Sequence, residues 1–510
     1  MEDTSATIRF IGIDAIFQYA GSGVQLFSGM IFYVVIVRLF TETSVGAIAL
    51  FVAVIGLFNI IFTFGLNAAA QHFISFSLGQ GDYSTVKNTI FKFIGIGAFI
   101  SLIGFFGLLL MAPLLSNIFF HSASYTLLVR MLSIVLFGNI FYGILNGALL
   151  GMQNFRLSAF VNIIIWITYY GVSMLFAIFY RSLEAIIIGW IIGITVGVLA
   201  ELVFIILSIK RYGGPGLNVP TYTFIFSYSF PILLSTLISY GAASVDRFIV
   251  SGILNLYALG VYNFSLLIAT SISLLSSPFN NILMPKFSEM FAKGAKGVIR
   301  PTVIVSSTLL ASIYVPAAMG IATLAPIILY LLGGISYLSG ILPLRIIMVS
   351  TAVFVTQNVF VQAIASIRKT RLLFYSSITG LISNLLLSFL LIPTYGLVGA
   401  SIGYSSVSAS SFFLLYWFAK REGLALLDVV GIVKIWIAAI LMFIIVDLIS
   451  GILGIRSLFF PLYAMLGALI YLIIIRLLRV FKNDSKEFIL SLFPKHFSKV
   501  TDILLFLLLH

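Results

Sequence analysis

The sequence lacks cysteine altogether and contains only four histidines among its 510 residues. Disulfides, thiol catalysis, cysteine zinc sites and haem-thiolate chemistry are therefore excluded, and no cofactor-bearing redox enzyme is expected. Charged residues are also scarce, at 8% of the chain against about 25% in soluble domains. Hydrophobic residues make up 61% of the chain, which excludes a water-soluble globular fold and predicts an all-α polytopic membrane protein.

Apolar runs of spanning length fill most of the chain. A spanning helix needs roughly 20 apolar residues, and we count fourteen runs broken by Gly, Pro, Asn or charge. They lie at about 10–37, 44–68, 88–115, 125–150, 157–180, 184–208, 221–246, 255–282, 300–332, 340–366, 371–393, 396–419, 429–450 and 457–478. The run at 300–332 contains two prolines and can form one broken helix. The tail at 481–510 is predicted to be a basic amphipathic helix on the inner leaflet or a disordered end.

The net charge of +13 does not indicate nucleic-acid binding, because membrane proteins concentrate Lys and Arg in their cytoplasmic connections. Fourteen alternating spans place 22 of the 28 cations on the amino-terminal side. The other six are Arg38, Arg130, Arg181, Arg247, Arg345 and Arg456. This split predicts a multi-pass membrane protein with both termini in the cytoplasm.

An internal repeat relates the two halves of the chain. Gly46 recurs at Gly260, 214 residues later, and Arg130 recurs at Arg345 after 215 residues. Six helices per repeat is an even number, so both copies have the same orientation in the membrane. We therefore predict an N-lobe at 1–211, a C-lobe at 212–420, a further helix pair at 421–480 and the tail at 481–510. Two similar lobes with a cavity between them indicate a transporter.

Two motifs carry a family resemblance. The stretch Asp246–Val250, followed by Gly260, Val261 and Tyr262, resembles the seventh-to-eighth helix junction of polysaccharide-biosynthesis (Wzx-like) flippases in the MATE and lipid-II-flippase (MOP) superfamily. The stretch Asn384–Ala400 resembles the Asn-rich helix, Pro, Tyr-Gly turn and Gly-Ala helix start that these proteins share.

The resemblance implies a transporter that flips a polyprenyl- or dolichyl-(di)phosphate-linked oligosaccharide across the plasma membrane for surface glycan or glycoprotein assembly. The expected mechanism is alternating access of the two lobes of a monomer, with membrane lipids around it. A cation-coupled multidrug exporter of the same superfamily is the alternative within transport. A glycan polymerase or glycosyltransferase needs a catalytic carboxylate or a large polar loop, and the connections of this chain offer neither. We therefore expect no enzyme.

Arginines within apolar runs are the first candidates for binding a substrate phosphate, because the planar guanidinium suits a desolvated anion. Arg130 and Arg345 lie in the outer turns of repeat-related helices, and Arg38 and Arg247 lie near the outer ends of two others. The alternative is that these long side chains reach the outer headgroups and serve as anchors.

Polar residues within the runs are candidates for a cavity surface. Glu201 is the acidic residue furthest from either predicted membrane interface. It could bind H⁺ or Na⁺ to drive transport, or else form an interhelical hydrogen bond. Asp14, Gln18 and Gln25 form a stripe on one helical face. Asn59, Asn280, Gln357 and Asn358 could contact sugar hydroxyls or bond neighbouring helices. Asp246 is expected to cap its helix as a local ion pair with Arg247.

Overall fold

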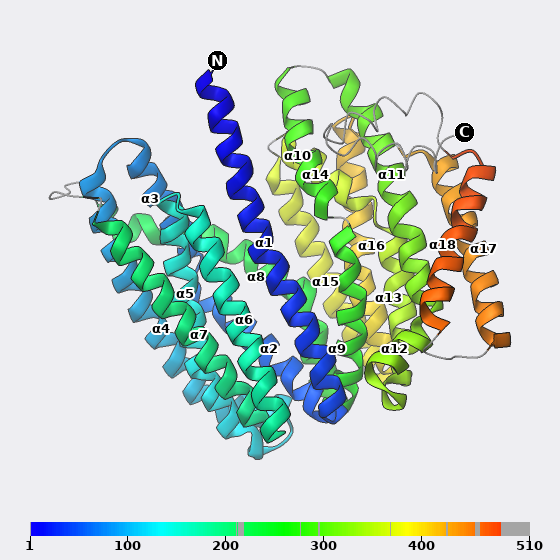
Figure 1. Ribbon diagram of the computed structural model, residues 1–510, viewed down its shortest axis with the longest axis horizontal. Helices are drawn as coiled ribbons and strands as arrows, with labels where there is room; N and C mark the ends of the chain where they lie inside the picture. Colours follow the sequence, from blue (N-terminus) through cyan, green and yellow to red (C-terminus); the bar gives the residue numbers. More distant parts are fainter. Residues whose placement is uncertain are drawn as a thin grey trace. The chain divides into compact units, whose positions relative to one another are not determined.

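The computed structural model describes residues 2–210, 212, 219–275, 277–293, 296–367, 369–424, 427–453 and 459–480. Side chains are described from residue 17 onward, apart from 274–282, 285, 292, 296–298 and 453. Within these limits every regular element is a helix (Figure 1). The predicted all-α membrane fold is confirmed.

The first eight α-helices cover the first half of the chain. They are α1 (Glu2–Leu39), α2 (Glu42–Thr63), α3 (Leu66–Gly79), α4 (Tyr83–Phe119), α5 (Thr126–Gly151), α6 (Phe155–Tyr180), α7 (Leu183–Ile209) and α8 (Tyr222–Ile253), with the 3₁₀ turn η1 (Ala123–Tyr125) before α5. The run predicted at 44–68 is divided, because Phe64 and Gly65 adopt left-handed conformations with φ of 53° and 72°. The chain then continues past residue 68 as α3.

Ten further α-helices follow in the second half. They are α9 (Leu256–Ser271), α10 (Ser277–Ala292), α11 (Lys296–Thr323), α12 (Ala325–Gly333), α13 (Ile341–Val353), α14 (Gln357–Ser366), α15 (Thr370–Tyr395), α16 (Leu397–Arg421), α17 (Val429–Leu453) and α18 (Phe460–Leu477), with the 3₁₀ turns η2 (Ile272–Leu275) and η3 (Ile335–Gly340). The run at 300–332 breaks at Leu324, because Pro326 lies in the first turn of α12 and starts a new helix.

Thirteen helices in the described part of the chain are long and apolar enough to cross a membrane. The remaining predicted span, at 255–282, falls on the shorter apolar helix α9 and continues through η2 into α10. The predicted number of about fourteen spans therefore agrees with the helices observed.

The chain divides into two compact units. The first comprises Met1–Tyr240 and Leu254–Gly260, and the second comprises Gly241–Ile253 and Val261–His510. In the first unit α1 packs on α6, α6 on α7, and α5 on both α4 and α7. In the second unit α15 packs on α16, α13 on α11 and α16, and α17 on α11 and α18.

Small residues bring the helices of the first unit close together. A Cβ atom built on Gly189 of α7 would lie 2.6 Å from the backbone nitrogen of Ser173 in α6. One built on Gly193, a turn later, would lie 2.6 Å from the backbone nitrogen of Tyr169. Close backbone approach of this kind is how helices associate within lipid. It fixes α7, and with it Glu201, against α6.

Candidate functional site

Glu201 is buried among three helices of the first unit. It lies in α7 with no exposed surface, and its Oε1 accepts a hydrogen bond of 3.0 Å from Asn146 Nδ2 of α5. The same amide nitrogen donates its second hydrogen to the Ser158 hydroxyl of α6, also at 3.0 Å. The Glu201 Oε2 atom is buried and has no hydrogen-bond partner within the described part of the chain. The carboxyl group thus has one oxygen free for a proton or a small cation.

A second polar contact lies one helical turn from Asn146 and Ser158. The Tyr142 hydroxyl of α5 donates to Asn162 Oδ1 of α6 at 2.8 Å. Tyr142 and Asn146 are four residues apart on α5, and Ser158 and Asn162 are four apart on α6. The polar side chains therefore face each other along the α5–α6 contact. Of the residues in this cluster, only Glu201 was predicted from the sequence, although polar residues four positions apart occur in both α5 and α6.

Asp246 is a second buried carboxylate, in the second unit. The expectation that it caps a helix is wrong, because α8 continues for seven residues to Ile253. Its side chain has no exposed surface, and its Oδ2 accepts a 2.6 Å hydrogen bond from the Tyr262 hydroxyl. The guanidinium of Arg247 is half-buried and lies 3.5 Å from the Ser244 hydroxyl. Asp246 therefore joins α8 to α9 inside the unit.

The residues of the two sequence motifs meet around Asp246. The Tyr262 hydroxyl also lies 3.3 Å from the carbonyl oxygen of Ala400 in α16. Asn384 Nδ2 of α15 donates to the carbonyl of Ala242 at 3.0 Å, and its Oδ1 accepts from Ser388 at 2.8 Å. Four helices are therefore tied together by motif side chains. The described residues hold no group of three or more His, Asp or Glu that could bind a metal ion.

The four candidate arginines have different surroundings. Arg345 of α13 donates from Nε to the carbonyl of Ala322 at 3.0 Å, and its Nη2 lies 3.5 Å from Asp447 Oδ1 of α17. Its guanidinium also lies over the Phe443 ring, 5.8 Å from the ring centre. Arg130 and Arg38 are exposed. Arg345 thus contacts α17, which belongs to the predicted helix pair at 421–480 that has no counterpart in the first repeat.

Several of the amides that were predicted to line a cavity form hydrogen bonds with nearby protein groups. Gln18 Nε2 donates to the carbonyl of Phe155 at 2.7 Å, and Asn59 Oδ1 accepts from Thr63 at 3.1 Å. Asn358 donates to a carbonyl three residues earlier at 3.3 Å. Gln25 is exposed and Gln357 is half-buried. The side chains of Asp14 and Asn280 lie outside the described residues.

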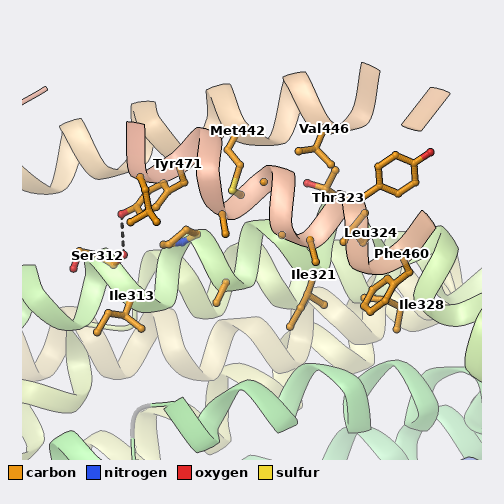
Figure 2. Close-up of a pocket in the computed structure, with 18 residues that line it drawn as sticks. Ser312, Ile313, Ile321, Thr323, Leu324, Ile328, Met442, Val446, Phe460 and Tyr471 are labelled. Atoms are coloured by element: carbon orange, nitrogen blue, oxygen red, sulfur yellow. Dashed lines mark hydrogen bonds between the residues drawn. The ribbon is translucent and has the colours of Figure 1, made fainter. Parts of the chain in front are cut away.

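An apolar pocket of about 430 Å³ lies in the second unit between α11, α12, α17 and α18 (Figure 2). Figure 2 shows Met442 and Val446 of α17 directed toward the pocket from one side and Ile321 and Ile328 from the other. Its lining also includes Phe460 and Tyr463, so aromatic and aliphatic carbon dominates the surface. At one end the Tyr471 hydroxyl donates to the carbonyl of Ser312 at 2.8 Å. The size and lining of the pocket suit an apolar ligand.

The chain shares its fold with solved membrane transport proteins, one of which is described as a member of the MOP superfamily. A lipid II flippase in its inward closed conformation superposes with a TM-score of 0.71 at 16% identity, covering 91% of this chain and 97% of the flippase. An inward-facing multidrug resistance MATE transporter of that superfamily gives 0.63 at 14% identity, covering 80% and 94%. At these identities the likeness shows a shared fold. The two solved structures are of a lipid II flippase and of a multidrug resistance transporter.

Residues 35–342 match the model of the family described as polysaccharide biosynthesis protein. Because the match covers more than half of the chain, the protein belongs to this family, and the predicted resemblance is confirmed. An uncharacterized membrane protein of Methanocaldococcus jannaschii is 26% identical over 200 residues. That alignment covers 38% of this chain and 45% of the relative, so the chain matches less than half the length of this curated protein.

Proposed function

We propose that this protein flips a polyprenyl- or dolichyl-(di)phosphate-linked oligosaccharide across the plasma membrane for surface glycan or glycoprotein assembly. One observation carries the proposal: a chain of the polysaccharide biosynthesis family shares its fold with a lipid flippase over 91% of its length. The family description supports a sugar, and the shared fold supports movement of a lipid. A lipid-linked sugar combines the two.

The lipid part of such a substrate needs an apolar surface inside the protein or at its edge. The pocket between α11, α12, α17 and α18 has about 430 Å³ of space and a lining dominated by aliphatic and aromatic carbon (Figure 2). Pockets of a few hundred Å³ with this character suit hydrocarbon ligands. We assign the isoprenoid chain to this pocket.

The phosphate part needs a cation with directed donors. Arg130, Arg345, Arg38 and Arg247 are the candidates, since a guanidinium can hold a phosphate through two parallel hydrogen bonds. Arg345 is placed to bind the phosphate near the lipid chain. Its contact with Asp447 holds it beside α17, and α17 also lines the apolar pocket. The sugar hydroxyls would then be bound by amides, among them Gln25 and Gln357.

Glu201 is our proposed site for the coupling ion, H⁺ or Na⁺. Its buried carboxyl has one oxygen bonded to Asn146 and the other without a partner in the described part of the chain. A carboxylate inside the membrane is costly unless it is protonated or paired. Binding and release of a cation would therefore change the charge at the α5–α6–α7 contact during the transport cycle.

The transport cycle follows from the repeat. We propose that residues 1–211 and 212–420 act as two lobes that expose the substrate alternately to the cytoplasm and to the outside. The helix pair at 421–480 accompanies the second lobe, both termini lie in the cytoplasm, and the protein works as a monomer.

Ligand binding by the purified protein tests the proposed substrate class. We expect a polyprenyl-diphosphate-linked oligosaccharide to bind more tightly than polyprenyl phosphate alone, and the free oligosaccharide to bind weakly. A cationic drug is the matched competitor. Displacement of the lipid-linked sugar by the drug, or tight drug binding without any sugar binding, would favour the multidrug exporter and contradict the proposal.

A further inference from the structure

A second cavity of the second unit has a different lining. It measures about 490 Å³ and lies where the first half of α11 meets the beginning of α17 and the end of α18. Aliphatic side chains such as Val305 and Val480 form part of the wall, and two cations, Lys434 and Arg479, form another part. The cavity therefore joins an apolar surface to a positively charged one.

The positive charge of this cavity is available to a ligand. Among the residues that the structure describes, Lys434 Nζ makes one polar contact, at 3.3 Å to the carbonyl oxygen of Arg479, and this contact is solvent-exposed. No hydrogen bond or ion pair of the Arg479 guanidinium occurs within the described residues. Asp428, the acidic residue of the lining, instead caps α17, with its Oδ1 accepting from the backbone N–H of Gly431 at 2.9 Å. Two cations thus face the cavity while its carboxylate is bonded to the backbone.

The cavity lies at the depth of lipid headgroups. Arg479 follows the last residue of the α18 span by two positions, and Asp428 immediately precedes the α17 span. Lys434 lies five residues into that span, or about 7.5 Å at 1.5 Å per residue, within reach of the interface for a long side chain. These helix ends lie on the side of the membrane that is predicted to hold 22 of the 28 cations and to face the cytoplasm.

We propose that the cavity binds the phosphate of an anionic phospholipid from the cytoplasmic leaflet. Lys434 and Arg479 would hold the phosphate through charge-assisted hydrogen bonds, and the Thr308 hydroxyl lies on the same lining. The aliphatic wall would contact the first carbons of the acyl chains. Basic pockets between spanning helices on the cytoplasmic side are typical sites for anionic headgroups. The bound lipid would join α17 and α18 to α11, a role separate from substrate transport.

Native mass spectrometry of the purified full chain tests this site. Phosphatidylglycerol is titrated against phosphatidylcholine, with sn-glycerol 3-phosphate as the soluble phosphate. We expect phosphatidylglycerol to bind at least about ten-fold more tightly than phosphatidylcholine. The double variant Lys434→Gln with Arg479→Gln should lose that preference. The exchanged pair Lys434→Arg with Arg479→Lys should keep it.

The matched control is Lys420→Gln with Arg421→Gln, which removes two exposed cations at the end of α16 outside the cavity. It should leave the preference unchanged. If the Gln double variant does not fold, Val430→Trp narrows the cavity and keeps both charges, and it should also weaken phosphatidylglycerol binding. Equal binding of the two phospholipids, an equal loss in the control, or competition by glycerol phosphate at the affinity of the lipid would overturn the proposal. None of these results depends on the transported substrate.

Discussion

Gly46 and Gly260, which occupy equivalent places in the two sequence repeats, pack directly against each other. A Cβ atom built on Gly46 would lie 2.9 Å from the backbone nitrogen of Gly260, and one built on Gly260 would lie 3.0 Å from the backbone nitrogen of Gly46. Each would collide even more closely with a carbonyl, that of Leu256 or of Glu42. The two glycines, both in the first unit, therefore bring α2 into backbone contact with the first turn of α9 at Leu256–Gly260.

The first prediction follows from this contact. Gly46→Ala and Gly260→Ala should each destabilise the protein by about 1–3 kcal/mol, because the added methyl group has no space and the backbone must move. Thermal unfolding of the purified protein in detergent measures the effect. Gly95→Ala in α4 is the control, since nothing lies within 4 Å of its built Cβ and alanine is the better helix former. Equal melting temperatures for all three variants would contradict the predicted contact.

Sequence periodicity was sufficient to predict the spans, because apolar runs of membrane length leave little freedom in a chain with 8% charged residues. It did not predict the break between α2 and α3, since Phe64 gives no signal for its left-handed conformation. The hydrogen-bond partners of Glu201 were also not predicted from the sequence. Asn146 and Ser158 come from different helices, and only the packing of α5, α6 and α7 brings them together.

Glu201→Gln should fold normally and lose ion coupling. Glutamine keeps an acceptor for Asn146 but cannot ionise, and its amide N–H₂ group takes the place of the buried, unpartnered Oε2, so stability should fall by about 1–3 kcal/mol. Transport by the wild-type protein should depend on pH or on Na⁺, whereas the variant should show a flat response. Transport rates measured across pH and Na⁺ concentration provide the comparison.

Glu184→Gln, at the exposed start of the same helix, is the control and should behave as wild type. Wild-type pH and Na⁺ dependence in Glu201→Gln would leave the carboxyl as an interhelical contact alone.

Variants of the Arg345–Asp447 pair distinguish a structural role of Arg345 from a role in binding the substrate phosphate. The two side chains are 34% and 52% exposed, so their pairing should contribute less than about 1 kcal/mol, and Asp447→Asn should be nearly as stable as wild type. If Arg345 binds phosphate, Arg345→Lys should weaken lipid-linked sugar binding about ten-fold, and Asp447→Asn should not. Equal effects of the two variants on affinity would show that Arg345 acts only through its partner. Arg130→Lys, measured in parallel, tests the repeat-related position.

Single cysteines test the membrane orientation in this cysteine-free chain. Ile335→Cys, at the 74%-exposed Ile335 between α12 and α13, should react with an impermeant maleimide in intact cells. Lys293→Cys, after α10, should react only once the membrane is permeabilised. The reverse pattern would invert the predicted topology and move the phospholipid site to the outer leaflet.

Movement of a lipid-linked oligosaccharide by the purified protein in liposomes tests the central claim most directly. The lipid-linked sugar is incorporated during reconstitution, and its exposure outside the vesicles is followed with an impermeant glycosidase. The account predicts that nearly all of the sugar becomes accessible when the protein is present, and that only the fraction already outside is cleaved in protein-free vesicles. The account would be contradicted if the glycosidase cleaved the same fraction of the sugar in both preparations. The reconstituted protein must at the same time transport a cationic drug, which shows that it is active.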